Sequence, residues 1–274
     1  MTRAILAALL LALALPAQAQ FNFNRLIDAA KSLTQPGASG EIDEKQEIEI
    51  GRDMAAMLLG AAPLVPNPEL QRYVNNVGRW LASQTERPDL PWHFGVLDAP
   101  QLNAFAAPGG FVFLTLGLVK RMKSEAELAG VLAHEIVHVV KKHHLKAIQK
   151  NAQAQVAGSV LSLALQDRSS AVRERLISFG TEMYSRGLDK SDELEADRIG
   201  VVIAARGGYD AYGLPAVLQA LQAMNPEDSG LALMFKTHPA PAERLDALEQ
   251  TMQPTLDAYA NQPQLAERFL QNTR

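Results

Sequence analysis

Cysteine is absent from this chain of 274 residues. The absence excludes disulfide bonds, a lipid anchor on a cysteine, thiolate nucleophiles and thiolate metal ligands. Long basic clusters are missing too: the formal net charge is −4, and the densest basic stretch is KKHH at residues 141–144. We therefore expect no nucleic-acid partner. No period of roughly 20 to 50 residues repeats, so a solenoid is not expected.

The apolar run at the N-terminus is too short to span a membrane. It extends from Ala4 to Leu15, twelve residues, whereas a helix needs ~20 to cross the hydrocarbon core. One basic residue precedes the run, and AQA, the small-x-small pattern that signal peptidases cut, ends at Ala19. We therefore expect a signal peptide over residues 1–19 and export to the periplasm, with no lipid anchor and no transmembrane span in the mature chain.

Apolar residues at helical spacing dominate the rest of the chain. After a flexible leader over residues 20–43, the spacing predicts a helix over residues 46–59. A second helix is predicted to open at Pro68, with Asn67 as its N-cap. From Ser124 onward the pattern is helical again. The chain is therefore expected to be mainly α-helical.

The apolar pattern changes in the middle of the chain. WHFGVLDA (92–99) and LNAFAAPGGFVFLTLG (102–117) predict three short strands, the last two joined across residues 108–110. A small sheet inside a mainly helical chain indicates an α+β fold. We expect one domain over residues 44–254, followed by a helical tail at 255–274.

A histidine pair lies on the helix that a predicted capping box at Ser124 opens. In VLAHEIVHVV (131–140), His134 and His138 are one turn apart on one face, so both imidazoles can reach one ion. Glu135 stands beside them and can reach a water on that ion. This is the HExxH zinc-peptidase pattern. The alternative is a pair of hydrogen-bonded histidines on a half-buried helix.

Catalytic zinc usually has three protein ligands and a water, so a third ligand is required. His144 follows His134 by ten residues, the metzincin spacing, but Lys141 occupies the position of the glycine that breaks the metzincin helix. On a continued helix, His144 would lie about 9 Å along the axis from His138 and on another side. His143 is excluded for a similar reason.

The segment SDELEADRIGVVIAARGG (191–208) offers a carboxylate instead. Ser191 can cap a helix there, and two glycines end it. Glu193 and Asp197 are four residues apart on one face of this helix. A stripe of small residues allows close packing against the histidine helix: Ala196, Gly200 and Ala204. Glu193 is therefore the predicted third ligand.

Together these motifs resemble a known family. HExxH followed by ExxAD (193–197) is similar to the gluzincin zinc metallopeptidases related to HtpX, to the CAAX prenyl proteases and to the periplasmic proteins LoiP and BepA. Four more segments resemble that family in the same order: EKQEIEIGR (44–52), NAFAAPGGFVFLTLGLV (103–119), GGYDAYGLPAVLQAL (207–221) and THPAPAERL (237–245). The transmembrane pair of HtpX, the tetratricopeptide tail of BepA and the lipobox cysteine of LoiP have no counterpart. The chain therefore resembles a stand-alone, soluble periplasmic member.

The resemblance implies a zincin-type helical domain with a small sheet beside the HExxH helix. It implies one Zn²⁺ per chain, held by His134, His138 and Glu193. Glu135 would take a proton from the attacking water and pass it to the leaving amine. Asp197 would orient one of the histidines.

Three further side chains near these motifs have open roles. His238 could stabilise the oxyanion or enter the metal sphere of an idle site, or be an ordinary loop histidine. The catalytic role is favoured because Pro239 restricts its backbone. Arg244 could pair with a site carboxylate or form a surface ion pair. Glu195 is expected to be solvated or in a salt bridge.

Substrate contacts are expected along the strand beside the histidine helix. Asn103, Ala104, Phe105 and Ala106 would supply main-chain hydrogen bonds to an added strand of substrate, although the phenylalanines of this hairpin also suit a core. Residues 151–190 could form a lid or a surface that touches membranes or clients, and the sequence does not decide between them.

The resemblance implies a periplasmic zinc metalloendopeptidase that acts in quality control of misfolded or unassembled envelope proteins. Its partners would be unfolded polypeptides and the outer-membrane assembly machinery. The alternative is a zinc-containing, chaperone-like client binder with little proteolysis. Glu135 argues against that alternative, because a structural metal site has no use for a general base.

Overall fold

The computed structural model describes residues 42–148, 188–224, 231 and 234–274. It contains one mixed sheet of three strands, in the order β1-β3-β2. The strands are β1 (His93–Leu97), β2 (Ala104–Ala107) and β3 (Phe111–Thr115). β1 runs parallel to β3, whereas β2 runs antiparallel to it and lies at the edge of the sheet. All three predicted strands are thereby confirmed.

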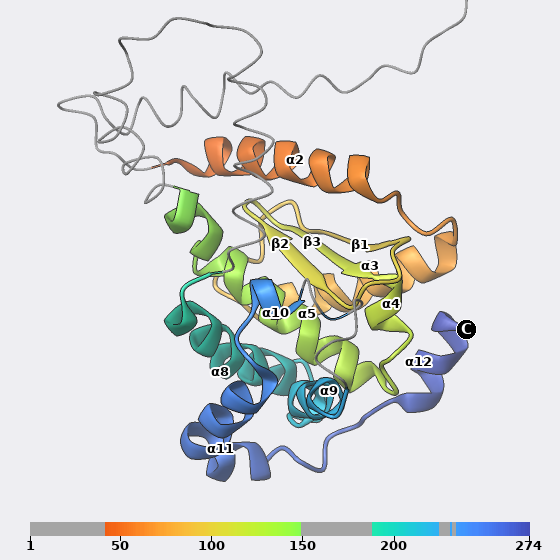
Figure 1. Ribbon diagram of the computed structural model, residues 1–274, viewed down its shortest axis with the longest axis vertical. Coiled ribbons are helices and arrows are strands. Elements are labelled where there is room, and N and C mark those ends of the chain that lie inside the picture. Colours follow the sequence, from red (N-terminus) through yellow and green to blue (C-terminus); the bar gives the residue numbers. More distant parts are fainter. Residues whose placement is uncertain (1–41, 149–187, 225–230, 232–233) are drawn as a thin grey trace, which may run out of the picture.

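Helix α2 (Glu44–Ala61) lies across one face of this sheet (Figure 1). A Cβ on Gly51 would lie 1.6 Å from the carbonyl oxygen of Pro108, so the helix rests directly on the β2–β3 turn. That turn needs glycine, because Gly109 and Gly110 adopt φ of 74° and 102°. Buried Glu47 accepts a hydrogen bond from the Gly109 N–H at 3.1 Å. The predicted turn at residues 108–110 is therefore a docking point for α2.

The other face of the sheet packs on α3 (Pro68–Ala82) and α5 (Glu125–Val140). Asn67 caps α3 as predicted and accepts hydrogen bonds from two backbone N–H groups. Ser124 caps α5, but Glu127 returns its side chain to the N–H of Lys123, so only half of the predicted capping box forms. The strand expected to reach residue 117 ends at Thr115.

Among the described residues, six more helices follow the sheet in the chain, in addition to the helical residues 143–148. They are α4 (Leu116–Val119), α8 (Lys190–Arg206), α9 (Gly213–Gln222), α10 (Met234–Thr237), α11 (Pro241–Asp257) and α12 (Ala266–Thr273). Helices α8 and α9 pack on α5 on the side away from the sheet (Figure 1). Helix α11 packs against α8 and α9. The expected α+β, mainly helical fold is confirmed.

Helix α5 forms the centre of the molecule. Every one of its residues except Glu127 is buried. A Cβ on Gly200 would lie 3.0 Å from the backbone nitrogen of His134, so α8 approaches α5 almost backbone to backbone. The predicted close packing along the small-residue stripe of α8 is confirmed. It brings the carboxylates of α8 within reach of the histidines of α5.

Two boundary predictions were wrong. Helix α5 ends at Val140, and Lys142 takes a left-handed conformation (φ 58°) that turns the chain back before residue 143. The position derived for His144 on a continued helix therefore does not apply. Helix α8 begins at Lys190, so its N-cap is Asp189 and Ser191 lies inside it.

Several other predictions concern the ends of the chain and the segment after α5. The predicted signal peptide, nearly all of the leader and nearly all of residues 151–190 lie outside the described residues. The boundary expected at residue 254 falls within α11, and α12 packs against α3 and α5. Among the described helices, none has the length and apolar character needed to cross a bilayer.

Candidate metal centre

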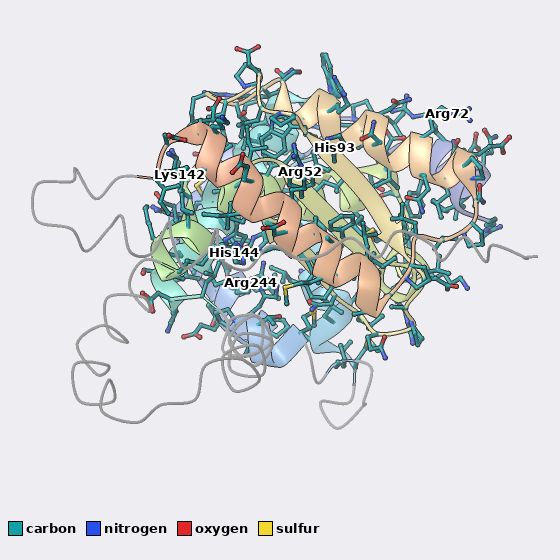
Figure 2. The ribbon with its side chains drawn as sticks, turned by 90° about the horizontal axis from the view of Figure 1, so that it is seen from above. Arg52, Arg72, His93, Lys142, His144 and Arg244 are labelled. Atoms are coloured by element: carbon teal, nitrogen blue, oxygen red, sulfur yellow. The ribbon has the colours of Figure 1, made fainter. Side chains whose placement is uncertain are left out.

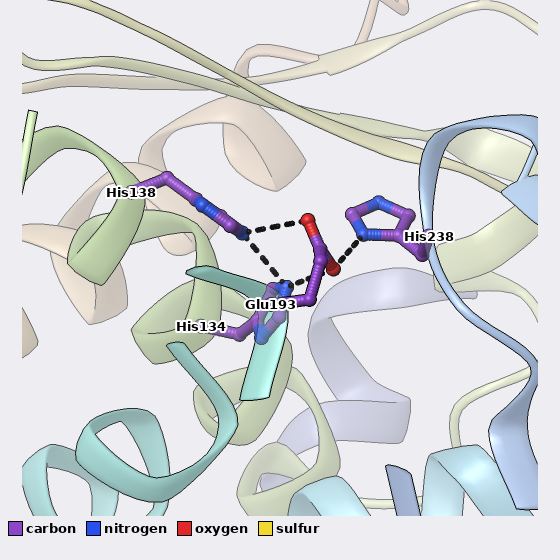
Figure 3. A group of neighbouring side chains, drawn as sticks. All are labelled: His134, His138, Glu193 and His238. Atoms are coloured by element: carbon purple, nitrogen blue, oxygen red, sulfur yellow. Dashed lines mark hydrogen bonds and ion pairs between the residues drawn. The ribbon is translucent and has the colours of Figure 1, made fainter. Parts of the chain in front are cut away.

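Four side chains from three segments converge beneath the sheet (Figure 3). His134 and His138 come from α5, Glu193 from α8, and His238 from the chain just after α10. Each offers one ligand atom, and these atoms all lie within 4.8 Å of one another. The first three side chains are buried and His238 is half-buried. The three predicted metal ligands are thus brought together with a third histidine, His238.

The polar atoms of this group fit a cation better than they fit each other. The Nε2 atoms of His134 and His138 lie 3.0 Å apart, although at most one of them can donate to the other. Oε1 of Glu193 accepts no hydrogen bond within the described residues and lies 3.5 Å from Nε2 of His138. A buried carboxylate whose two oxygens face the Nε2 atoms of His138 and His134 provides the donor set that Zn²⁺ accepts.

His134 is anchored from its other ring nitrogen. Nδ1 lies 2.9 Å from Oδ1 of Asp197, and Arg244 grips that carboxylate through Nε at 2.8 Å and a terminal nitrogen at 2.6 Å. Arg244 also approaches Nδ1 of His134 to 3.3 Å. A guanidinium can only donate, so the proton on Nδ1 is directed to Asp197. That leaves Nε2 of His134 directed at the group of four.

The charges of this anchor shift the pKa values in opposite directions. Burial would raise the pKa of Asp197, but Arg244 lowers it to about 2. Burial and Arg244 act to lower the pKa of His134, and Asp197 and Glu193 outweigh them and raise it to about 9. Burial keeps the pKa of His138 well below its ordinary value. In the metal-free protein the two histidines are therefore not equivalent.

Glu135 lies next to the group and is 2% exposed. Burial raises the pKa of its carboxyl, and the nearby histidines partly oppose the shift. Glu135 lines a cavity of about 30 Å³ together with His134, His238 and Asn103. That volume is sufficient for about two water molecules. The cavity places a carboxyl with raised proton affinity where a reacting water could lie.

Asn103 changes one substrate prediction. Its main-chain N–H donates to the Thr115 hydroxyl at 3.0 Å, and its carbonyl accepts from the N–H and hydroxyl of Thr115. The main chain of Asn103 is therefore already used, which contradicts its predicted main-chain role. Asn103 also lines the cavity. Within the described residues neither polar atom of this buried amide has a hydrogen-bond partner.

His143, which the sequence argument excluded as the third metal ligand, is outside the group of four but contacts one of its histidines. Because the chain turns back at Lys142, Nδ1 of His143 lies 3.0 Å from Nδ1 of His138. Nε2 of His143 lies 3.1 Å from Oε2 of Glu195, so Glu195, which was expected to be solvated or in a salt bridge, accepts a hydrogen bond from His143. A histidine three residues after the helix end was the only sequence signal for this contact.

His144 and Arg244 also lie near the site. The ring of His144 is 5.6 Å from that of His138, centroid to centroid, and burial lowers its pKa to about 4. His144 is nevertheless not part of the group of four. Arg244 is 5% exposed, so it pairs with a site carboxylate and does not form a surface ion pair. Figure 2 shows both residues on the side of α2 opposite His93.

Residues 68–252 match the model of Peptidase family M48. The chain belongs to this family, whose members are metallopeptidases. The predicted family resemblance and enzyme class are confirmed at that level.

Curated relatives agree with this assignment. The chain is 32% identical over 226 residues to the beta-barrel assembly-enhancing protease of Escherichia coli O157:H7, which covers 80% of this chain and 46% of that protein. It is 33% identical over 218 residues to the protein of the same name from Yersinia pestis, covering 77% and 44%. It is 31% identical over 182 residues to the mitochondrial metalloendopeptidase OMA1 of Schizosaccharomyces pombe, covering 65% and 52%. The chain thus spans about half the length of these relatives.

Proposed function

We propose that this chain is a zinc metalloendopeptidase of the periplasm that cleaves misfolded or unassembled envelope proteins. The observation that carries the proposal is the position of Glu135, buried in one cavity with His134 and beside the His-His-Glu group. Peptidase family M48 supplies the enzyme class. The names of the beta-barrel assembly-enhancing relatives support the link to outer-membrane assembly.

One Zn²⁺ per chain would be held by His134, His138 and Glu193. When bound, zinc would supply Lewis-acid polarisation and an activated water at neutral pH. Glu135 would accept the proton as water attacks the peptide carbonyl and then return it to the leaving amine. Its raised pKa suits this task, because a general base works best near the pH of its surroundings.

The substrate would pair with β2, the edge strand of the sheet. Beyond β2 no further strand is present in the part of the chain that the structure describes. Ala104 to Ala106 would offer main-chain hydrogen bonds to an extended peptide, which binds such edges with little regard to side chains. The Asn103 amide would join them from the cavity, donating to a peptide carbonyl or accepting from a peptide N–H.

Replacing Glu135 with glutamine tests the enzyme hypothesis. Glu135→Gln should keep zinc and fold but lose cleavage of an unfolded substrate such as casein by ~10²–10⁴-fold, because the water loses its proton acceptor. The matched control is Glu127→Gln on the same helix, where the glutamine oxygen can still accept from Lys123 N–H. Its cleavage rate should match the wild type.

The chaperone-like alternative gives the opposite result. A wild-type protein that contains zinc but shows no chelator-sensitive cleavage of unfolded proteins would favour a client binder. Mass spectrometry of peptides retained by Glu135→Gln would then identify the clients in either case. In the enzyme, the same peptides should disappear when wild-type protein replaces the variant.

A further inference from the structure

His143 is the one fully buried histidine outside the group of four. It begins a helical segment, residues 143–148, that starts immediately after the turn at Lys142. Lys142 itself lies 3.5 Å from Glu47 of α2 through its ammonium group. Figure 2 places Lys142 at the beginning of α2. The contact between Lys142 and Glu47 therefore attaches the turn to α2, and the turn places the side chain of His143 against His138.

The contacts of His143 define a chain of hydrogen bonds. Its Nε2 faces Oε2 of Glu195 at 3.1 Å, with Asp192 farther away at 3.9 Å. A carboxylate can only accept, so the proton on the His143 ring is directed to Glu195. Nδ1 of His143 then presents a lone pair to Nδ1 of His138, 3.0 Å away. His138 must donate from Nδ1, and its Nε2 is left with the lone pair.

Both histidines of α5 thus donate from Nδ1 and direct Nε2 to the group of four, but their Nδ1 atoms have different partners. Nδ1 of His134 is held directly by Asp197 of α8. Within the described residues Nδ1 of His138 contacts no carboxylate of α8 directly, and His143 bridges it to Glu195 of that helix. Helix α8 therefore provides Glu193 to the group of four and anchors both imidazoles behind it.

We propose that His143, backed by Glu195, is a positioning residue that fixes the tautomer and ring orientation of His138 for metal binding. The proposal rests on the metal-binding part of the proposed function and not on peptidase activity. Partners of this kind hold a ligating ring in place, and their loss weakens metal affinity. His143 does not itself bind the ion of the group of four.

Zinc affinity, measured by competition with a chromogenic chelator, tests the proposal with two variants of His143. His143→Leu fills the buried space but leaves Nδ1–H of His138 without an acceptor, and it should weaken zinc binding roughly 10–100-fold. His143→Asn places an amide oxygen near the former Nδ1, and it should keep the affinity within about threefold of wild type. His93→Ala, an exposed histidine at the start of β1, is the control and should bind zinc as the wild type does.

Two results would overturn the proposal. Equal affinities of His143→Leu and His143→Asn would show that His143 only fills space. Two zinc equivalents in the wild type, falling to one in both His143→Leu and Asp192→Ala, would show that His143, Asp192 and Glu195 hold a cation of their own. A wild type that binds zinc with the expected variant pattern but cleaves nothing would leave this proposal intact and refute the peptidase hypothesis.

Discussion

Two buried glutamates, Glu125 at the start of α5 and Glu193 of α8 beside the histidines of α5, have opposite surroundings. Glu125 and Glu193 are both fully buried. Each oxygen of Glu125 accepts from a tyrosine hydroxyl at 2.8 Å, one from Tyr73 and one from Tyr209, and Arg268 donates to both oxygens. Glu193 contacts only imidazoles, and its Oε1 accepts no hydrogen bond within the described residues.

The difference separates a carboxylate whose two oxygens both accept hydrogen bonds from one that has an oxygen accepting none within the described residues. Both oxygens of Glu125 have hydrogen-bond donors in the protein, and these contacts connect α5 to α3 and α12. Oε1 of Glu193 has room for a further positive group, because it accepts no hydrogen bond in the part of the chain that the structure describes. Burial opposes its charge, but His238 and His138 hold its pKa well below the ordinary value. A buried, charged carboxylate with an unfilled oxygen is the condition that a bound cation relieves.

The largest expected effect is that substitution of Glu193 changes zinc affinity but not stability, whereas substitution of Glu125 changes stability but not zinc affinity. Glu193→Gln should weaken zinc affinity by more than the roughly 10–100-fold expected when a residue that only hydrogen-bonds a ligand is lost. The unfolding free energy of the metal-free protein should not change. Glu125→Gln should keep zinc and lose ~1–3 kcal/mol of unfolding free energy, because a hydrogen-bonded buried charge is removed. Metal analysis of the purified proteins and urea unfolding in the presence of a chelator give the two measurements.

His144 provides the matching control for the ligand argument. His144→Ala should retain about one Zn²⁺ per chain, whereas His134→Ala and His138→Ala should be depleted. If His144→Ala loses the metal and Glu193→Gln does not, His144 is the third ligand and the comparison of the two glutamates fails.

His238 gives an intermediate effect. Its Nδ1 lies 2.6 Å from Oε2 of Glu193, within the group of four. Four protein ligands would close the site, since catalytic zinc keeps one position open. This contact favours the inhibitory role over the catalytic one that the sequence favoured. If about nine-tenths of the protein is closed, His238→Ala should raise the cleavage rate about tenfold.

The same variant distinguishes the other two roles. A fall of ~10²–10³ in kcat would identify His238 as an oxyanion donor. Activity and chelator sensitivity both within twofold of the wild type would make it an ordinary loop residue. Rates are compared at equal zinc content, so that a change in metal occupancy is not mistaken for a change in catalysis.

Local patterns predicted most of this structure. The spacing of His134 and His138 on one turn and the small-residue stripe of α8 were sufficient to predict that Glu193 meets the histidines. The turn at Lys142 was not predictable, because a left-handed lysine carries no sequence signal comparable to glycine. Its consequence, the contact of His143 with His138, was therefore missed. The buried pairing of Arg244 depends on how α11 packs on α8, which periodicity does not specify.

Asp197 extends the comparison, because it is a carboxylate beside the group of four whose two oxygens both have partners in the protein. Arg244 lowers its pKa from the ordinary 3.8 to about 2. A depressed pKa stabilises the fold fully above the ordinary value, and this stabilisation is lost as the pH falls from about 4 through about 2. A shift of this size corresponds to about 2 kcal/mol. Asp197→Asn lacks this titration, so the difference in unfolding free energy between the chelator-treated wild type and this variant should shrink by about 2 kcal/mol between pH 5 and pH 2. A difference that stays constant over this range would show that Arg244 does not depress the pKa of Asp197.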